Sequence, residues 1–379
     1  MSERGKSEVG GWTLLERSKG RDNNLNTLRL VFAAMVLLGH SFPVLMRGSQ
    51  DALSRLLAST NIAETGVNAF FVVSGFLIVK SINRNDIIYY TSSRVLRIYP
   101  ALIVCTLLTI LVMAAYSTLP AAEYFSHNQT KRFLHNMHLS ETVIGRLPGV
   151  FADRNIEVVN VSLWTLVVEL RCYLIVGVLG VLGIFRNRLF GSIAIMVMLA
   201  MIWTDLGPNV PLIHEKEGWH RTFSFFMIGG LAYLNRDAIR LDARIFVFAL
   251  LAFWFLQGTP NYDLMVILPF AYIVLYLSYG PRFRDVTEGF GDISYGLYIY
   301  AFPVQQALGA SFPGLNGYVH AAIALAITAV LAKLSWELVE KHALRLKWVP
   351  SKLIDRVLPG RVDLPRRDKV VLTQTDKVF

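Results

Sequence analysis

The sequence NLNTLRLVFAAMVLLGHSFPV, residues 24–44, is an apolar stretch that carries Arg29 near its start and His40 towards its end. Its length and composition predict a helix that crosses the hydrocarbon core of a membrane. At a rise of about 1.5 Å per residue, the two ionisable side chains lie roughly 16 Å apart along such a helix. Ionisable groups inside a membrane helix are costly and are functional-site candidates. Two structural alternatives stay open: Arg29 could reach the lipid headgroups, and His40 could hydrogen-bond a neighbouring helix.

The whole chain has the composition of a polytopic membrane protein. Of its 379 residues, 54% are hydrophobic and only 17% are charged, which is too apolar for a soluble enzyme. The net charge of +10 comes from short clusters of Lys and Arg between apolar runs, so we assign it to membrane topology and expect no nucleic-acid partner. Cys105 and Cys172 lie inside apolar runs and show no zinc spacing, so we expect neither a disulfide nor a metal site.

Ten apolar runs are long enough, or nearly long enough, to cross a bilayer, which predicts an all-α bundle of about ten transmembrane helices. Several of the runs are shorter than usual, notably the sixth and the seventh, so a merged or re-entrant pair stays open. An even number of spans places both termini on one side. The runs cover residues 26–46, 64–82, 95–115, 161–185, 189–206, 221–235, 244–258, 262–279, 292–310 and 318–339.

The charges of the connections predict which side faces the cytoplasm. One set of connections is basic, whereas the short loops of the other set near residues 257–261 and 311–317 contain no Lys or Arg. By the positive-inside rule, both termini are therefore cytoplasmic. We expect residues 1–23 to form a cytoplasmic extension without a signal peptide, and residues 24–347 to form the transmembrane domain. Within that domain we expect residues 116–160 to form an outer loop that caps the bundle, followed by a basic cytoplasmic tail at 348–379 on anionic lipid.

This topology sorts the ionisable groups by depth. Arg29 lies near the cytoplasmic end of its helix. Arg94 and Arg97 lie on the same side of the membrane, three residues apart on one helical face. His40 lies in the outer half, and Glu169, in SLWTLVVELRCY, is expected at about the same depth. The sequence thus predicts an axis with arginines at one end and a histidine and a carboxylate at the other.

An acyl transfer reaction would use both ends of this axis. A neutral imidazole such as His40 can take a proton from an acceptor hydroxyl, and a carboxylate such as Glu169 can stabilise the imidazolium. Guanidinium groups such as Arg29, Arg94 and Arg97 suit phosphates. A donor with a phosphorylated head and a long arm, such as acyl-coenzyme A, would span the distance between the two ends.

Six motifs in order resemble the bacterial membrane-bound acyltransferase-three family, over nearly the whole chain from Asn24 to Lys347. The motifs are NLNTLRLVFAAMVLLGH, FFVVSGFLI, RVLRIYP, SLWTLVVELRCY, DISYGLYIYAFPVQQ and SWELVEKHALRLK. The resemblance implies transfer of an acetyl group from cytoplasmic acetyl-coenzyme A to a sugar hydroxyl of a lipopolysaccharide, exopolysaccharide, peptidoglycan or lipo-oligosaccharide. It also implies a bacterial inner-membrane location. Where the letters match, it implies roles for Arg29, His40, Arg94 and Arg97, and for Glu169.

The sequence departs from the family's pattern at three places. Ala301 stands where many relatives have a histidine, Asn68 stands where an acidic residue is common, and the last motif reads Glu340, Lys341, His342 instead of ending in proline. We therefore assign no role to Ala301 and no carboxylate role to position 68. The aromatic residues of SYGLYIYAFP are interpreted as packing and an interfacial belt.

Two other classes of function stay open from the residues alone. A transporter could line a polar pathway with the same intramembrane charges, although no inverted repeat is visible in the two halves of the chain. A membrane scaffold without catalytic activity would leave the axis unexplained. The partners that we expect are acyl-coenzyme A, a glycan or glycolipid acceptor and membrane lipid, and a homo-oligomeric state is left open.

Overall fold

The computed structural model describes residues 12–20, 23–46, 48–140, 143–154, 156–204, 218–282, 291–351 and 353 of the chain. The described residues form a helical bundle with one short pair of strands, so the predicted all-α class is confirmed. Residues 1–11 of the predicted extension and most of the predicted tail at 348–379 lie outside the described residues.

The long helices of the bundle are α2 (Leu25–Leu45), α4 (Ile62–Arg84), α5 (Ile87–Met113), α8 (Leu163–Val181), α9 (Arg188–Ile202), α10 (Trp219–Leu234), α11 (Ala243–Phe255), α13 (Ile267–Tyr279), α14 (Ser294–Ser311) and α15 (Gly317–Ser335). The short elements are β1 (Trp12–Thr13), α1 (Leu14–Arg17), α3 (Ala52–Leu56), η1 (Ala114–Tyr116), α6 (Ala121–Ser126), α7 (Asn128–Phe133), η2 (Leu134–His138), η3 (Ile184–Arg186), β2 (Arg240–Leu241), α12 (Tyr262–Met265), η5 (Trp336–Glu340), α16 (Lys341–Arg345) and η6 (Leu346–Trp348).

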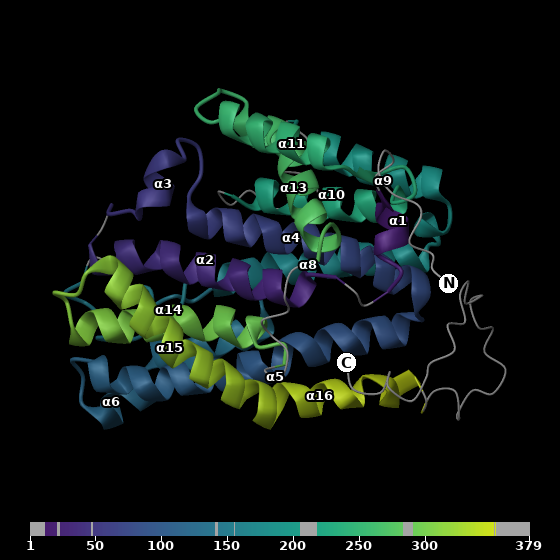
Figure 1. The fold of residues 1–379 in the computed structure, drawn as a ribbon. Helices are drawn as coiled ribbons and strands as arrows, with labels where there is room; N and C mark the ends of the chain where they lie inside the picture. The colour runs from purple at the N-terminus through teal and green to yellow at the C-terminus, as the bar shows by residue number, and fades with distance from the viewer. Residues whose placement is uncertain are drawn as a thin grey trace, which may run out of the picture.

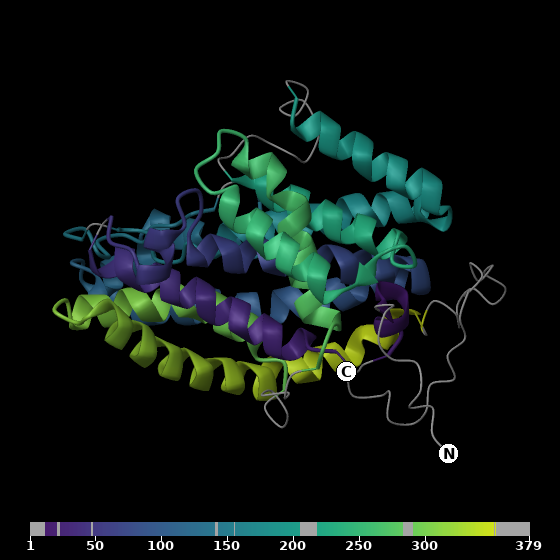
Figure 2. The same cartoon turned by 45° about the horizontal axis from the view of Figure 1, so that its top comes forward.

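Helix α4 forms the centre of the bundle, with α2 on one side and α10 and α13 on the other (Figure 1). Its contact with α10 is close because small residues face each other. A Cβ atom on Gly75 would clash with the carbonyl oxygen of Phe226, and one on Gly229 would clash with that of Val72. Backbones without intervening side chains are typical of helix packing in membranes. Helix α15 runs along the outer edge of the α2–α14 pair and continues into α16 (Figure 2).

Among the described residues, six helices are long and apolar enough to cross a membrane. They are Leu25–Leu45, Ile62–Arg84, Ile87–Tyr116, Leu163–Val181, Tyr262–Tyr279 and Gly317–Ser351, and shorter apolar helices lie at Arg188–Ile202 and Ala243–Phe255. Each of the ten predicted runs overlaps with a helix in the described part of the chain. The chain is therefore a polytopic membrane protein, and the count of ten spans stays a prediction.

The two described ends of the chain meet at the same end of the bundle. Helices α1 and α16 lie there, while α3 and α6 lie at the opposite end (Figure 1). The start of the chain is attached to the bundle, because the Arg17 side chain donates to the carbonyl oxygens of Tyr279 and Gly280, at 3.0 and 2.6 Å. Strand β1 pairs with β2 in antiparallel orientation.

The segment from η1 to the start of α8 packs against the ends of α5 and α14 around its own small core. Tyr124 is fully buried there, and its hydroxyl donates to the carbonyl oxygen of Ile110 at 2.9 Å. The core residues are Ile110, Met113, Tyr124, Phe133, Leu147, Val150, Phe151 and Val159. Arg154 attaches the segment to the bundle by donating to the carbonyl oxygens of Gly309 and Val44. We call this segment the cap.

Candidate active site

Helices α2 and α14 lie side by side and run in the same direction. Successive residues of α2 therefore contact successive residues of α14. Arg29 pairs with Asp292 at one end. Further along, the ring of His40 packs edge to face against that of Phe302, with centroids 5.4 Å apart. The side-chain amide of Gln305 donates to the carbonyl oxygen of Leu37 at 2.7 Å. The predicted axis from Arg29 to His40 therefore has a parallel partner in α14.

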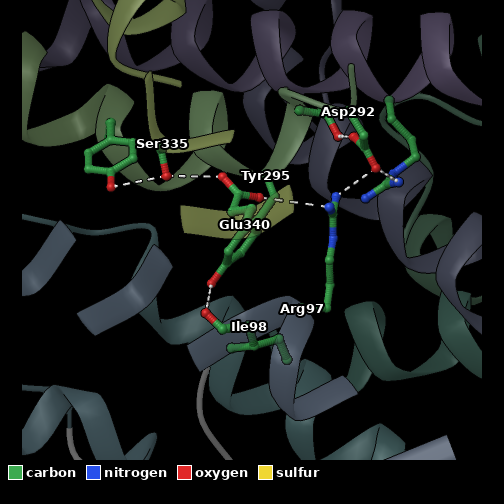
Figure 3. Close-up of polar contacts among 9 residues, drawn as sticks. Arg97, Ile98, Asp292, Tyr295, Ser335 and Glu340 are labelled. Atoms are coloured by element: carbon green, nitrogen blue, oxygen red, sulfur yellow. Dashed lines mark hydrogen bonds and ion pairs between the residues drawn. The ribbon is translucent and has the colours of Figure 1, made fainter. Parts of the chain in front are cut away.

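Asp292 holds two arginines at the first end. Its Oδ2 atom accepts from Arg29 Nη1 at 2.6 Å and from Arg97 Nη2 at 2.8 Å, and its Oδ1 atom accepts from Ser294 Oγ at 2.6 Å (Figure 3). Between 14% and 24% of these three charged side chains is exposed. In such a partly buried place the ion pairs are less screened than surface pairs. One carboxylate thus fixes arginines from α2 and α5.

Glu340 extends this network on the side of α15. It ends the π-helical turn η5, a type of local irregularity that is frequent at functional sites. Its side chain is 1% exposed, accepts from Ser335 Oγ at 3.0 Å and lies 3.8 Å from Arg97 Nη1 (Figure 3). Arg97 therefore lies between two carboxylates, and its guanidinium also lies over the ring of Tyr295, 5.6 Å from the centroid.

Arg94 and Glu169 meet on either side of Tyr173. The Arg94 guanidinium carbon lies 5.8 Å from the centroid of the Tyr173 ring. The Tyr173 hydroxyl donates to Glu169 Oε1, which also accepts from Ser74 Oγ at 3.3 Å. In the described part of the chain, Arg94 makes no ion pair with a carboxylate. Unlike Arg29 and Arg97, it is not paired with Asp292, and its Nε donates to Ser93 Oγ at 3.3 Å.

A cavity of about 480 Å³ connects these groups, except Ser335 and Glu340, which do not line it. On α4 alone its lining runs from Arg84 to Val67, a distance of about 26 Å along the helix. Among the residues that the structure describes, six basic side chains line it against two acidic ones, namely Arg29, Lys80, Arg84, Arg94, Arg97 and Lys347 against Glu169 and Asp292. The cavity is therefore long, positively charged and suited to an elongated anionic ligand.

Aromatic side chains form the inner end of the cavity. The Phe70 ring packs edge to face on Phe32, with centroids 5.6 Å apart, and on Tyr298, at 6.0 Å. The hydroxyl groups of Tyr298 and Thr165 lie 2.6 Å apart. Phe70, Tyr298 and Thr165 all line the cavity. We call Phe32, Phe70 and Tyr298 the aromatic layer.

His40 lies beyond the aromatic layer. Its neighbour Gly39 touches α4 so closely that a Cβ atom there would come 2.7 Å from Ala63. Ala63 is one helical turn, about 6 Å, beyond Val67, where the cavity lining on α4 ends. Among the described residues, the His40 ring has no hydrogen-bond partner, and it does not line the cavity. It is the one predicted site residue outside the cavity.

The structure thus brings four of the five predicted site residues to one cavity, namely Arg29, Arg94, Arg97 and Glu169. It does not place Glu169 beside His40. Because Glu169 bonds to Ser74, eleven residues along α4 from Ala63, the carboxylate lies about 16 Å from the level of His40. The described hydrogen bonds of Glu169 are with Ser74 and Tyr173, which line the same cavity.

Sequence reasoning did not single out Asp292. It begins the motif DISYGLYIYAFPVQQ, whose aromatic residues were interpreted as packing, yet Tyr295 and Tyr298 line the cavity. An acidic residue at the boundary of an apolar run is a usable signal, because three intramembrane arginines need a counter-charge. The same reasoning applies to Glu340.

Comparison with known proteins gives the family. A family model described as "Acyltransferase domain" matches residues 22–335. The chain is 30% identical over 334 residues to an O-acetyl transferase of Shigella phage Sf6, with 86% of this chain and 96% of that protein covered. It is 28% identical over 365 residues to Nodulation protein 10 of Rhizobium leguminosarum bv. viciae, with 88% and 96% covered. No solved structure matches the chain.

The matched region contains α2, all five predicted site residues of the axis, and the whole cavity wall on α4, α5, α8 and α14. Together with the bundle of apolar helices, this match decides the class of the protein. The chain belongs to the acyltransferase domain family and is a membrane acyltransferase, which transfers acyl groups other than aminoacyl groups.

Proposed function

We propose that the protein moves an acyl group, most simply acetyl, from cytoplasmic acyl-coenzyme A to a hydroxyl group of an exported or cell-surface carbohydrate. The observation that carries this proposal is the long basic cavity, which begins at the end of the bundle shared by α1 and α16 and stops one helical turn short of His40. The similarity to a protein named O-acetyl transferase supports the acetyl group and the oxygen acceptor. We place the protein in the bacterial inner membrane with ten spans and both termini in the cytoplasm.

The arginines would bind the phosphates of the donor. Arg94 has no carboxylate partner among the described residues; its Nε donates to Ser93 Oγ at 3.3 Å, and its two Nη groups would face the ligand. Arg29 and Arg97 each use only part of the guanidinium on Asp292, and an arginine has five N–H donors. Asp292 would then hold these two arginines in place before the donor arrives, so that little side-chain entropy is lost on binding.

The arm of the donor would extend past Glu169 towards the aromatic layer. The carboxylate of Glu169 can accept a hydrogen bond from an amide N–H of the pantetheine arm, a neutral donor with which a carboxylate pairs well. In this arrangement Glu169 acts on the donor side of the reaction. The thioester would lie near Phe70 and Tyr298, next to the level of His40.

His40 would act as the general base. Its neutral ring takes the proton of the acceptor hydroxyl while the hydroxyl oxygen forms a bond with the thioester carbonyl carbon. The carbon–sulfur bond then breaks, and the coenzyme A thiolate takes up a proton as it leaves. The same ring could instead carry the acyl group for a short time, in which case the C–S bond breaks first and the acceptor attacks the acyl-histidine.

The experiment that tests this proposal measures acetyl transfer in membrane vesicles. Inverted vesicles that contain the full chain receive acetyl-coenzyme A labelled in the acetyl group, and label in glycan is counted. We expect His40→Ala to lower transfer by at least about 100-fold, since it removes a general base. His135→Ala changes an exposed histidine of the cap and serves as the matched control. Transfer near the wild-type level in the His40 variant would refute the proposed role.

A further inference from the structure

The entrance of the cavity combines basic and aromatic side chains in a way that the proposed donor phosphates at Arg94 do not explain. Lys80 and Arg84 lie one turn apart at the end of α4, and both line the cavity. Tyr89, in the first turns of α5, lines it as well. We call these three residues and Trp348 the mouth.

Trp348 does not line the cavity but packs against Tyr89 at its entrance. It ends the turn η6, and its ring stacks on Tyr89 with centroids 4.0 Å apart and an angle of 33° between the planes. Trp348 is 39% exposed. A flat, half-exposed aromatic pair is a surface on which a nucleobase can stack.

The basic residues of the mouth retain charge for a ligand. Lys80 donates to the carbonyl oxygen of Ser18 at 2.8 Å, and in the part of the chain that the structure describes neither Lys80 nor Arg84 forms an ion pair. The nearby carboxylate Asp86 caps α5 by accepting from the Tyr89 backbone N–H at 2.8 Å, and it also accepts from Ser351. A net positive field therefore faces the entrance.

We propose that the mouth binds the adenosine end of the donor, with the base stacked on the outer face of the Tyr89–Trp348 pair and the ribose phosphate held by Lys80 and Arg84. The inference rests on the proposed function, because it takes coenzyme A as the donor. It adds a site for a second phosphate, separate from the diphosphate near Arg94. Two phosphate sites at different depths make the enzyme selective for coenzyme A over dephospho-coenzyme A, which lacks only the ribose phosphate.

The order of groups along the cavity supports this assignment. Arg84 is the last residue of α4, and Lys80, Ser74 and Val67 follow inward along the same helix. Arg94 lies about 10 Å into α5 from its start at Ile87. The sequence of mouth, Arg94, Glu169 and aromatic layer matches the order of ribose phosphate, diphosphate, amide-containing arm and thioester in the ligand.

The test is calorimetric titration of the purified full chain in nanodiscs of phosphatidylcholine, a lipid without net charge that does not compete for the basic residues. Wild-type protein should bind coenzyme A about tenfold more tightly than dephospho-coenzyme A, since a charged hydrogen-bonded contact is lost. Arg84→Gln should remove most of this preference, because it should weaken the binding of coenzyme A but not that of dephospho-coenzyme A. Lys80→Met should act in the same direction, but Arg84 is exposed and is therefore the safer substitution for folding.

The aromatic pair has a separate readout. Trp348→Ala should lower the affinity for both ligands by about the same factor, up to about tenfold, because both contain adenine. Trp348→Phe should restore most of the affinity. Arg240→Gln, an exposed arginine of β2 that does not line the cavity, is the matched control and should change nothing.

The outcomes separate this inference from the proposed function. Two results would show that the mouth does not bind the ribose phosphate: equal affinity of wild-type protein for both ligands, or an Arg84→Gln variant that still prefers coenzyme A. The basic residues of the mouth would then serve membrane orientation alone. In that case the donor proposal stands. If wild-type protein binds neither ligand, both this inference and the coenzyme A donor are overturned.

Discussion

The two ends of the α2–α14 pair differ in the kind of contact that holds them together. At the first end the contacts are ionic, with Arg29 and Arg97 on Asp292, and a large cavity opens beside them. At the other end they are neutral: Gln305 donates to the Leu37 carbonyl and to Ser41 Oγ, and His40 packs on Phe302. The charged end has room for a ligand before it arrives. At the histidine end the lining of the cavity stops at the aromatic layer, so a ligand in the cavity can reach His40 only if side chains move.

The largest effect is expected from removing the ion pairs of Asp292 at the first end. Asp292→Asn keeps the shape of the side chain but removes the charge that holds two partly buried arginines. Loss of one partner of a buried ion pair leaves an uncompensated charge, and we expect a loss of about 3 kcal/mol in stability. Thermal unfolding of the detergent-solubilised protein, followed by tryptophan fluorescence, measures it. An unchanged unfolding temperature would show that Asp292 is not the anchor of this end.

A smaller effect is expected from the same kind of change at the neutral end. Gln305→Met has a similar volume but removes both hydrogen bonds of a fully buried amide to α2. We expect a loss of about 1–2 kcal/mol, because the acceptors left behind are neutral. The unfolding assay used for Asp292→Asn gives a direct comparison. A loss equal to that of Asp292→Asn would remove the distinction between the two ends.

The aromatic layer between the ends should control the length of the acyl group. Phe70→Leu shortens a side chain that lines the inner end of the cavity and contacts Phe32 and Tyr298. We expect transfer from butyryl-coenzyme A to rise relative to acetyl-coenzyme A by up to about tenfold, the effect of a few methylene groups in an apolar pocket. Competition between the two labelled donors in vesicles gives the ratio. An unchanged ratio would place the thioester elsewhere.

The smallest effect is expected at the carboxylate that faces the donor arm. Tyr173→Phe removes the hydroxyl that donates to Glu169 but keeps the ring under Arg94. We expect the KM for acetyl-coenzyme A to change by about threefold with little change in kcat, since a single neutral donor is lost. A large fall in kcat with constant KM would instead assign the Tyr173–Glu169 pair to the chemical step.

The helices could be predicted from the sequence because apolar length is local information. The same holds for Arg29, Arg94 and Arg97, since a charge inside an apolar run must find a partner or a ligand. The identity of that partner is decided by packing, and Asp292, more than 190 positions away from Arg97, could not be chosen without the α2–α14 alignment. The depth of Glu169 was misjudged for a similar reason, because its level is fixed by Ser74 on another helix and not by its distance from the end of its own. Trp348 belongs to a stretch without helical periodicity and carried no signal for the mouth.

The central claim is that one helix carries the donor at its Arg29 end and the transfer reaction at its His40 end. A cryo-electron microscopy structure of the full chain in a nanodisc with coenzyme A bound tests it most directly. We predict the diphosphate within hydrogen-bonding distance of Arg94 and the sulfur at the aromatic layer, next to the level of His40. A nucleotide bound at the cap end, or a sulfur atom that stays near Arg84, would contradict the account.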